Sequence, residues 1–225
     1  MLLKKDLAKG YCSKVFSLLV LMLILIPNVK GEDDFYEHKD VWQTYYVSHS
    51  FNSKWSTLLL YNNMYSTKVG TRDVFIQNAL KYKLTKELYL EGIYRYEYTK
   101  GSNGWISENR PAVRMGLDTK WGQWKIRNRH RVELRLREHM SSRFRYRTDI
   151  RLKPSWNFSS FKISPYWMEE AFVSDHKISA LRTYLGLAGS KGRFVPCTYF
   201  MVQSYNKQEK FKHLMVYGVQ LGIKI

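Results

Sequence analysis

The chain has 225 residues, with 37 lysines and arginines against 19 aspartates and glutamates, and a formal net charge of +18. It contains 17 tyrosines, 11 phenylalanines and 7 tryptophans, but only 5 prolines. This length is enough for one domain with a sizeable core. A basic, aromatic composition is compatible with nucleic-acid binding, but the N-terminal sequence argues against nucleic acid as a partner.

Residues 1–31 have the pattern of a secretory signal peptide. A positively charged start precedes the apolar run VFSLLVLMLILI at 15–26, and Val29 and Gly31 are the small residues before a cut at Glu32. The charged start consists of Lys4, Lys5, Lys9 and Lys14. Because a membrane-spanning helix needs about 20 apolar residues, we expect a cleaved signal rather than the alternative, an uncleaved anchor. The mature domain is then 32–225.

The cysteines and histidines argue against a fold stabilised by disulfides or by a bound metal. Cys12 precedes the apolar run, so it is not a lipoprotein cysteine, and the mature chain keeps Cys197 alone. A single thiol cannot form an internal disulfide. The six histidines show no metal-ligand spacing, so we expect neither a metal nor a cofactor. They are His38, His49, His130, His139, His176 and His213.

From residue 41 onward the hydrophobic pattern has period two, which indicates strands with two different faces. Short polar connectors leave no room for crossover helices, so successive strands run antiparallel. The predicted strands are 41–51, 54–65, 72–84, 87–98, 107–121, 123–138, 142–156, 160–172, 177–188, 193–205 and 211–225. They reach the roughly 9–11 residues of a membrane-crossing strand, and closure removes exposed edges. The sequence therefore predicts an all-β fold, a single antiparallel up-and-down transmembrane β-barrel of 10–12 strands.

The number of strands and their orientation rest on weaker signals. Eleven segments are recognised, whereas bacterial single-chain barrels have an even number, so we expect ten or twelve strands, with 32–40 as the source of a twelfth. The connectors alternate between tighter ones (FNSK, TKE, WGQ, NFSS, SKG) and longer ones (STKVG, TKGSNG, EHMSS, VSDH, NKQEK). This alternation predicts short periplasmic turns and longer outer loops. The last strand has an uninterrupted apolar face, although it ends in Ile225 rather than an aromatic residue.

Two neighbouring segments, KIRNRHRVELRLR (125–137) and RFRYRTDIRLK (143–153), are charged at odd positions and mostly apolar at even ones. An arginine on the lipid side costs roughly 2–4 kcal/mol at the membrane centre, so the charged faces are predicted to line the lumen. Asn128 and His130 interrupt the apolar face, and we place them near the periplasmic rim. The predicted lumen-facing binding residues are Arg127, Arg129, Arg131, Glu133, Arg135, Arg137, Arg143, Arg145, Arg147, Asp149 and Arg151.

Charge pairing predicts the register between these two strands. A turn centred on Met140 sets Arg131 opposite Asp149 and Glu133 opposite Arg147. Opposite charges that face each other stabilise a strand pair. We therefore expect this register.

The sequence resembles an uncharacterised bacterial family of outer-membrane β-barrels. The resemblance is carried by the signal peptide, by Trp42–Gln43 on the first strand, by Lys54–Trp55 at the second, and by the central run RNRHRVELRLRE…RFRYRTDIRLK. It covers most of the mature chain and implies a barrel in the bacterial outer membrane without any established activity. In architecture and charge alone, the chain is also similar to small arginine-lined porins for acidic oligosaccharides.

Two functions follow for such a lumen, and the sequence leaves both open. The first is a narrow anion-preferring porin, because arginine rings select anions; its partners would be outer-membrane lipid and anionic solutes such as acidic oligosaccharides. The second is a structural barrel whose lumen is filled by an Arg/Glu/Asp network, as in small barrels.

Two further readings carry less weight. A lipid hydrolase needs a nucleophile and a base on one face, but His49 cannot meet Ser48 or Ser50 within one strand, and His130 and Glu133 face opposite ways. We therefore do not expect an enzyme. A soluble periplasmic barrel that binds an acidic ligand remains an alternative, which detergent dependence would discriminate.

Overall fold

The computed structural model describes residues 36–102, 104–138, 140–207 and 210–225. The predicted signal peptide, residues 1–31, lies outside this part of the chain. No helix among the described residues has the length and apolar character to cross a membrane.

Eleven strands make up most of the described chain, and each pairs with its neighbours in sequence through antiparallel ladders. The strands are β1 (Tyr36–Ser50), β2 (Trp55–Ser66), β3 (Gly70–Lys83), β4 (Leu88–Gly101), β5 (Gly104–Trp121), β6 (Trp124–Arg137), β7 (Arg143–Pro154), β8 (Ser164–Ser174), β9 (Lys177–Ala188), β10 (Phe194–Lys207) and β11 (Lys210–Lys224).

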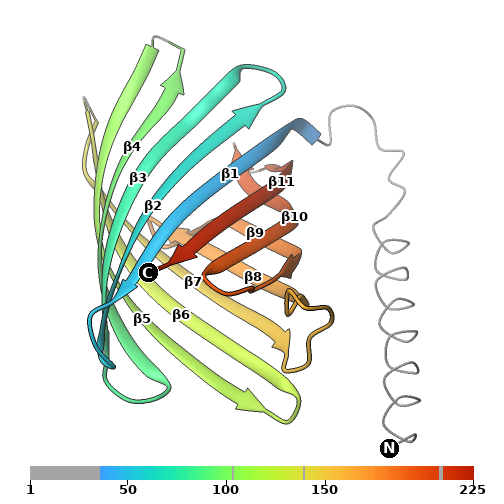
Figure 1. The fold of residues 1–225 in the computed structure, drawn as a ribbon. Helices are drawn as coiled ribbons and strands as arrows, with labels where there is room; N and C mark the ends of the chain where they lie inside the picture. Colours follow the sequence, from blue (N-terminus) through green and yellow to red (C-terminus); the bar gives the residue numbers. More distant parts are fainter. Residues whose placement is uncertain (1–35, 103, 139, 208–209) are drawn as a thin grey trace, which may run out of the picture. The chain divides into compact units, whose positions relative to one another are not determined.

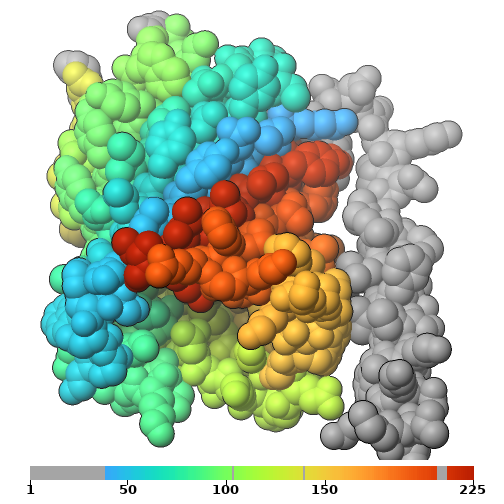
Figure 2. All heavy atoms as spheres, in the orientation of Figure 1, coloured from blue at the N-terminus to red at the C-terminus, as the bar shows by residue number. Residues whose placement is uncertain are grey.

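The sheet closes into a barrel between its first and last strands (Figure 1). In Figure 2 the atoms of β1, in blue, lie directly beside those of β11, in red. The two strands run parallel, with Trp42 opposite Gly218 and Val47 opposite Ile223. An odd number of up-and-down strands makes the first and last strands point the same way, so the closing ladder has to be parallel. The up-and-down barrel of 10–12 strands is thus confirmed. The narrower expectation of an even number, ten or twelve, is wrong, because the eleven described strands close without a twelfth.

The two ends of the barrel are named here by the strand termini they carry. The C-terminal end carries residue 225 and the connections at 51–54, 84–87, 122–123, 155–163 and 189–193; the N-terminal end carries the start of β1 and the other five connections. The connections at the C-terminal end reach nine residues, whereas those at the N-terminal end do not exceed five. The connectors expected to be the tighter set, from FNSK to SKG, are those at the C-terminal end. The expectation that this set is the shorter one is therefore wrong. One reason is that β8 begins at Ser164 rather than at 160, which lengthens the connection after β7.

The period-two pattern separates an outward and an inward face as predicted. On β7, Phe144 is 69% exposed on the outside, whereas Asp149 is buried inside. On β11, Tyr217 and Val219 are exposed, while Leu214 and Val216 are buried against the lumen. The exposed apolar rows therefore face outward, whereas the inward rows are polar on β6 and β7 and apolar on β11.

Four lumen tyrosines pack flat against glycines on the neighbouring strand, all in the half of the barrel toward the C-terminal end. The directly opposed pairs are Tyr46–Gly222, Tyr89–Gly116, Tyr166–Gly186 and Tyr199–Gly218. A Cβ atom on Gly218 would lie 1.9 Å from Cζ of Tyr199. Only glycine leaves space for a ring this close to the strand, a known use of glycine inside sheets.

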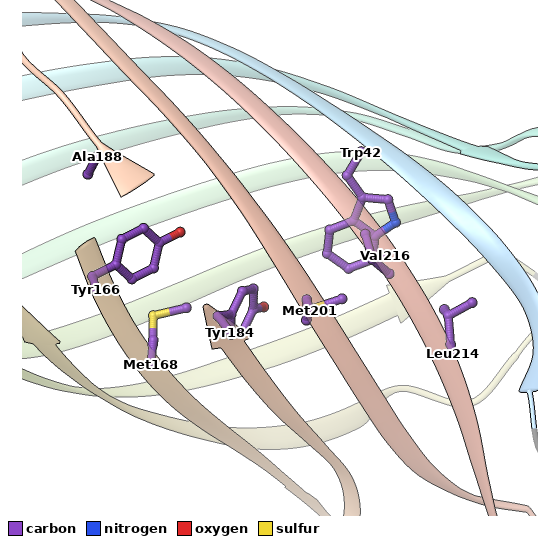
Figure 3. Close-up of a cluster of buried hydrophobic side chains, with 8 residues drawn as sticks. All are labelled: Trp42, Tyr166, Met168, Tyr184, Ala188, Met201, Leu214 and Val216. Carbon is purple, nitrogen blue, oxygen red and sulfur yellow. The ribbon is translucent and has the colours of Figure 1, made fainter. Parts of the chain in front are cut away.

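A buried apolar cluster fills the lumen side of β8–β11 and β1 (Figure 3). Its members are Trp42, Tyr166, Met168, Tyr184, Ala188, Met201, Leu214 and Val216. The opposite wall carries the arginines. The lumen is therefore narrowed from one side by a hydrophobic core and lined on the other by charge.

Candidate functional site: an arginine-lined lumen

The side chains predicted to face the lumen lie on the inward face of β6 and β7, while their role in binding stays a prediction. A lumen cavity of about 630 Å³ is lined by many side chains. Those from the predicted set are Arg127, Arg129, Arg131, Arg135, Arg145, Arg147 and Arg151. A second cavity of about 550 Å³, toward the N-terminal end, is lined by Arg135, Arg137, Arg143 and Arg145 among others. The two predicted acids, Glu133 and Asp149, are buried in the wall.

The register of β6 against β7 differs from the predicted one by two residues. Arg129 lies opposite Asp149, Glu133 lies opposite Arg145, and Arg131 faces Arg147. The Met140-centred register is therefore wrong. Both acids still meet an arginine across the ladder, with 2.9 Å between Arg129 Nε and Asp149 Oδ1, so charge pairing alone does not separate the two registers.

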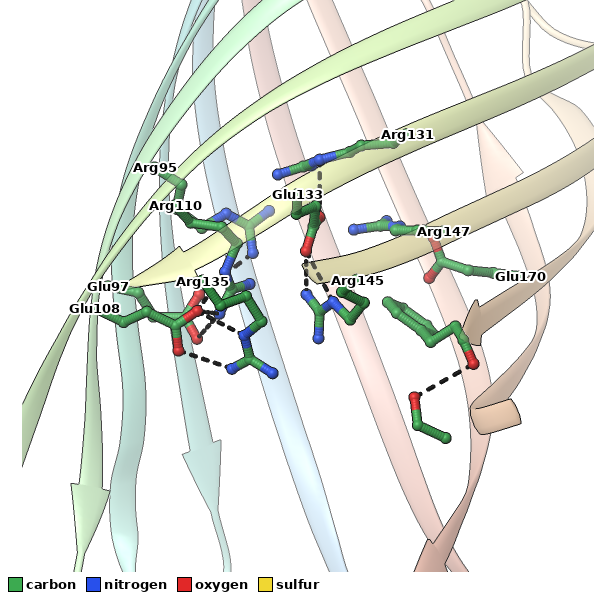
Figure 4. Close-up of polar contacts among 12 residues, drawn as sticks. Arg95, Glu97, Glu108, Arg110, Arg131, Glu133, Arg135, Arg145, Arg147 and Glu170 are labelled. Carbon is green, nitrogen blue, oxygen red and sulfur yellow. Dashed lines mark hydrogen bonds and ion pairs between the residues drawn. The ribbon is translucent and has the colours of Figure 1, made fainter. Parts of the chain in front are cut away.

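Glu108 on β5 holds three arginines together near the N-terminal end, and Figure 4 shows two of them, Arg110 and Arg135. Arg135 donates two hydrogen bonds to its carboxylate, at 2.6 and 2.7 Å. Arg137 and Arg110 donate through their Nε atoms at 2.6 and 2.7 Å, and Arg110 also reaches Glu97 at 3.0 Å. Such charge-assisted, partly bidentate contacts fix the positions of guanidinium groups.

Glu133 and Glu170 hold further arginines at the middle of the lumen. Arg145 donates to Glu133 Oε2, with 2.8 Å from its Nε. Arg131 Nε lies 2.8 Å from Glu133 Oε1, but the angles do not make a hydrogen bond, so this contact is ionic only. Glu170 accepts from Arg147 and, at 3.0 Å, from the hydroxyl of Tyr184. These carboxylates are almost fully buried, with Glu133 at 0% exposure, so they lie behind the arginines rather than in the open lumen.

Toward the C-terminal end three cations are held differently, and we call Lys81, Arg127 and Arg151 the C-terminal cationic cluster. The guanidinium of Arg151 lies over the ring of Tyr166, 3.8 Å from the centroid, and Lys81 Nζ lies 3.5 Å above Tyr89. Arg127 faces Arg151 directly across the ladder. Among the described residues, none of the three forms an ion pair with a carboxylate.

Glu108 and Arg110 on β5, which partner the arginine ladders, escaped the sequence reasoning. They form one network with Arg95 and Glu97 on β4. Most even positions of 107–121 are charged, as in the ladders, so a register across β5 and β6 could have placed them. The aromatic supports of the cationic cluster gave no comparable signal, because the register between consecutive strands has to be known first.

The histidines have other partners than the serine and glutamate neighbours considered from the sequence. His49 Nδ1 lies 3.0 Å from the carbonyl oxygen of Ile225. His130 lies at the middle of β6, not at a rim, and its ring contacts the hydroxyl of Tyr146. The outward-facing pair Ser204 and His213, 2.9 Å apart on neighbouring strands, was missed.

The Ser204–His213 pair alone does not make a hydrolase site. A serine hydrolase also needs donors for an oxyanion, whereas Ser204 lies in the ladders of β10 with both β9 and β11, which occupy its backbone. No group of three or more His, Cys, Asp or Glu among the described residues could hold a metal ion.

Comparisons with known proteins agree with this architecture. The β domain of the Bordetella autotransporter Brka, a crystal structure, matches with a TM-score of 0.52 and 12% sequence identity, covering 74% of this chain and 82% of that chain. At this identity the likeness shows the fold alone, an outer-membrane-type β-barrel. No curated protein matches the sequence significantly. The sequence profile of the family described as "Protein of unknown function (DUF2490)" matches residues 39–190. The chain therefore belongs to the DUF2490 family of outer-membrane-type barrels.

Proposed function

We propose that this protein lies in the bacterial outer membrane and forms a narrow, anion-preferring passage. The observation that carries the proposal is the charge of the cavity lining. Thirteen arginines and lysines line the larger cavity, against three acidic side chains, Asp73, Glu91 and Glu97. Rings of cationic side chains in a lumen select anions and phosphates.

The burial of the carboxylates supports this preference. Glu108, Glu133 and Glu170 are each at most 2% exposed, and their arginines extend from them toward the cavity. A solute in the lumen therefore meets guanidinium groups first. The ion pairs reduce the net charge, but Glu108, Glu133 and Glu170 are absent from the lining of the larger cavity, whereas Arg110, Arg135, Arg145 and Arg147 belong to it.

Arg135 and Arg145 lie where the two cavities of the proposed path meet. They line both the 630 Å³ cavity and the 550 Å³ cavity at the N-terminal end. Arg135 is fixed by Glu108 and Arg145 by Glu133. A solute that crosses the barrel would pass between these two side chains.

The outward face supports a membrane location with lipid as the partner. Large apolar side chains such as Val113, Phe144 and Val219 are exposed on it. Trp55, Trp121 and Trp124 lie at strand ends and are also exposed, where outer-membrane barrels carry aromatic girdles. A soluble barrel would not expose such a band, so the protein should need detergent or lipid to stay in solution.

The alternative, a structural barrel filled by its own side chains, shares the same ion pairs. The apolar cluster around Met201 and Leu214 does fill one side of the lumen. A cavity of about 630 Å³ nevertheless remains between this cluster and the arginines, and both line it. Conductance separates the two functions, because a filled barrel would be silent.

The test is planar-bilayer recording of the refolded protein in a salt gradient. We expect small unitary currents and a reversal potential that indicates preference for the anion. The variant Arg135→Gln should reduce this preference, because it removes a cation that lines both cavities, while Arg110 and Arg137 still neutralise Glu108.

Arg193→Gln is the matched control. It changes an exposed arginine in the connection before β10, outside both cavities. The control should leave selectivity unchanged. Silent bilayers with correctly folded protein, or a preference for cations, would overturn the proposed passage.

A further inference from the structure

We propose that the C-terminal cationic cluster binds a dianionic ligand with oxygen acceptors, of the class of phosphate monoesters and dicarboxylates. The inference deepens the proposed anion passage, on which it rests for access, by naming the class of solute that the lumen holds.

The first support is charge that the protein leaves uncompensated. Arg127 and Arg151 face each other across β6 and β7, and like charges in this position destabilise a strand pair. The Nε atoms of both are shielded from solvent, and neither has a hydrogen-bond partner among the described residues. A bound oxyanion would accept from both guanidinium groups and remove the repulsion.

The second support is the way the cluster is held. Arg151 rests on the face of Tyr166, and Lys81 rests on Tyr89. An aromatic face attracts a cation without cancelling its charge as a carboxylate does. The rings themselves are fixed against Gly186 and Gly116. The cluster is therefore positioned in advance while its charge stays available to a ligand.

The nearby acids set the charge of the ligand. Glu91 is taken by Arg114, with 2.6 Å between Oε2 and Nη1. Asp118 lies opposite Arg127 on β5, but it is exposed and forms no ion pair among the described residues. Asp149 on β7 is paired with Arg129, with 2.9 Å between Oδ1 and Nε. Three cations against the carboxylate of Asp118 leave a local charge near +2, which a dianion would balance.

Access is provided from the C-terminal end. Lys125 and Lys153 form the next facing pair toward that end, and Lys125 is exposed. All three members of the cluster line the larger cavity. A mouth with one sign of charge raises the local concentration of the opposite ion.

The experiment is isothermal titration calorimetry of the refolded full barrel in detergent, with inorganic phosphate, succinate and acetate as separate probes. We expect phosphate or succinate to bind at least about tenfold more tightly than acetate, because only a dianion neutralises the cluster. The comparison of phosphate with succinate identifies which oxyanion chemistry is preferred. The double variant Arg127→Gln/Arg151→Gln should weaken binding by at least about tenfold, the loss expected for two charge-assisted contacts.

Arg193→Gln is again the control and should bind as the unmodified protein does. A second readout uses the thiol of Cys197, which lines the same cavity and lies 3.4 Å from the hydroxyl of Tyr166. Bound phosphate should slow its reaction with a thiol reagent in the unmodified protein but not in the double variant.

Equal phosphate affinity in the double variant, or acetate binding as tight as that of the dianions, would overturn the inference. The outcome is separable from the proposed passage. Binding without conductance would refute the passage alone, whereas anion-selective conductance without dianion binding would refute this site alone.

Discussion

The arginines near the N-terminal end and the cations near the C-terminal end are held by opposite means. Around Glu108 and Glu133, arginines donate to buried carboxylates at 2.6–2.8 Å. In the C-terminal cationic cluster, Arg151 and Lys81 rest on aromatic rings instead. Arginine therefore has two roles in one lumen. Arginines paired with carboxylates stabilise the wall, whereas arginines without a carboxylate partner keep a positive charge that a ligand can neutralise.

The difference has an energetic consequence. A buried ion pair that loses one partner leaves an isolated charge, which costs several kcal/mol. Two facing arginines that lose their charge relieve a repulsion instead. Removing a charge should thus destabilise the folded barrel at the ion pairs around Glu108 and Glu133, but not at the facing pair of Arg127 and Arg151. Unfolding measurements test this difference directly.

The largest effect is expected for Glu133→Gln. The substitution leaves Arg131 and Arg145 without their shared carboxylate in a site where Glu133 is 0% exposed. We expect a loss of about 3–5 kcal/mol in the free energy of unfolding, measured by urea titration of the barrel refolded in lipid vesicles.

Glu169→Gln is the matched control for this loss. Glu169 points outward on β8 and accepts from Thr183 at 3.0 Å, and no arginine depends on it in the described structure. Its removal should change the unfolding free energy by less than about 1 kcal/mol. A comparable loss in both variants would mean that the buried network has no special role in stability.

A smaller effect is expected for Gly218→Ala, which probes the flat tyrosines of the C-terminal half. The added methyl group would lie 1.9 Å from Tyr199 Cζ, so the ring has to leave its place on the strand. Overpacking of this kind costs about 1–3 kcal/mol, again read from urea titration. Gly92→Ala on β4 is the control, because a Cβ there meets nothing within 4 Å; equal losses at the two positions would show that the ring contact contributes nothing.

The sequence was sufficient for the barrel and for the inward direction of the arginines. Period-two alternation in 143–153 could only be satisfied with Arg145 inside and Phe144 outside, and a closed sheet followed from the tight connectors. The odd number of strands and the register of β6 against β7 were not predictable in the same way. The parallel closure of β1 on β11 involves no local signal, and two registers of β6 against β7 satisfy the same charges.

The division of the lumen into two regions was beyond sequence reasoning for a related reason. Whether an arginine meets Glu108 or Tyr166 depends on the register of its strand against the next one. Local patterns determine the face of a residue, whereas its cross-strand partner depends on that register, which the period-two pattern does not determine.

The smallest effect, and the sharpest contrast with Glu133→Gln, is expected for Arg127→Gln/Arg151→Gln. Removing two facing charges that have no carboxylate partner among the described residues should leave the free energy of unfolding unchanged or raise it by up to about 1 kcal/mol. Urea titration at low salt should show this most clearly, because added salt screens the repulsion in the unmodified protein. A loss of several kcal/mol would contradict the distinction between the two regions, since it would mean that these arginines are structural like those that Glu133 holds.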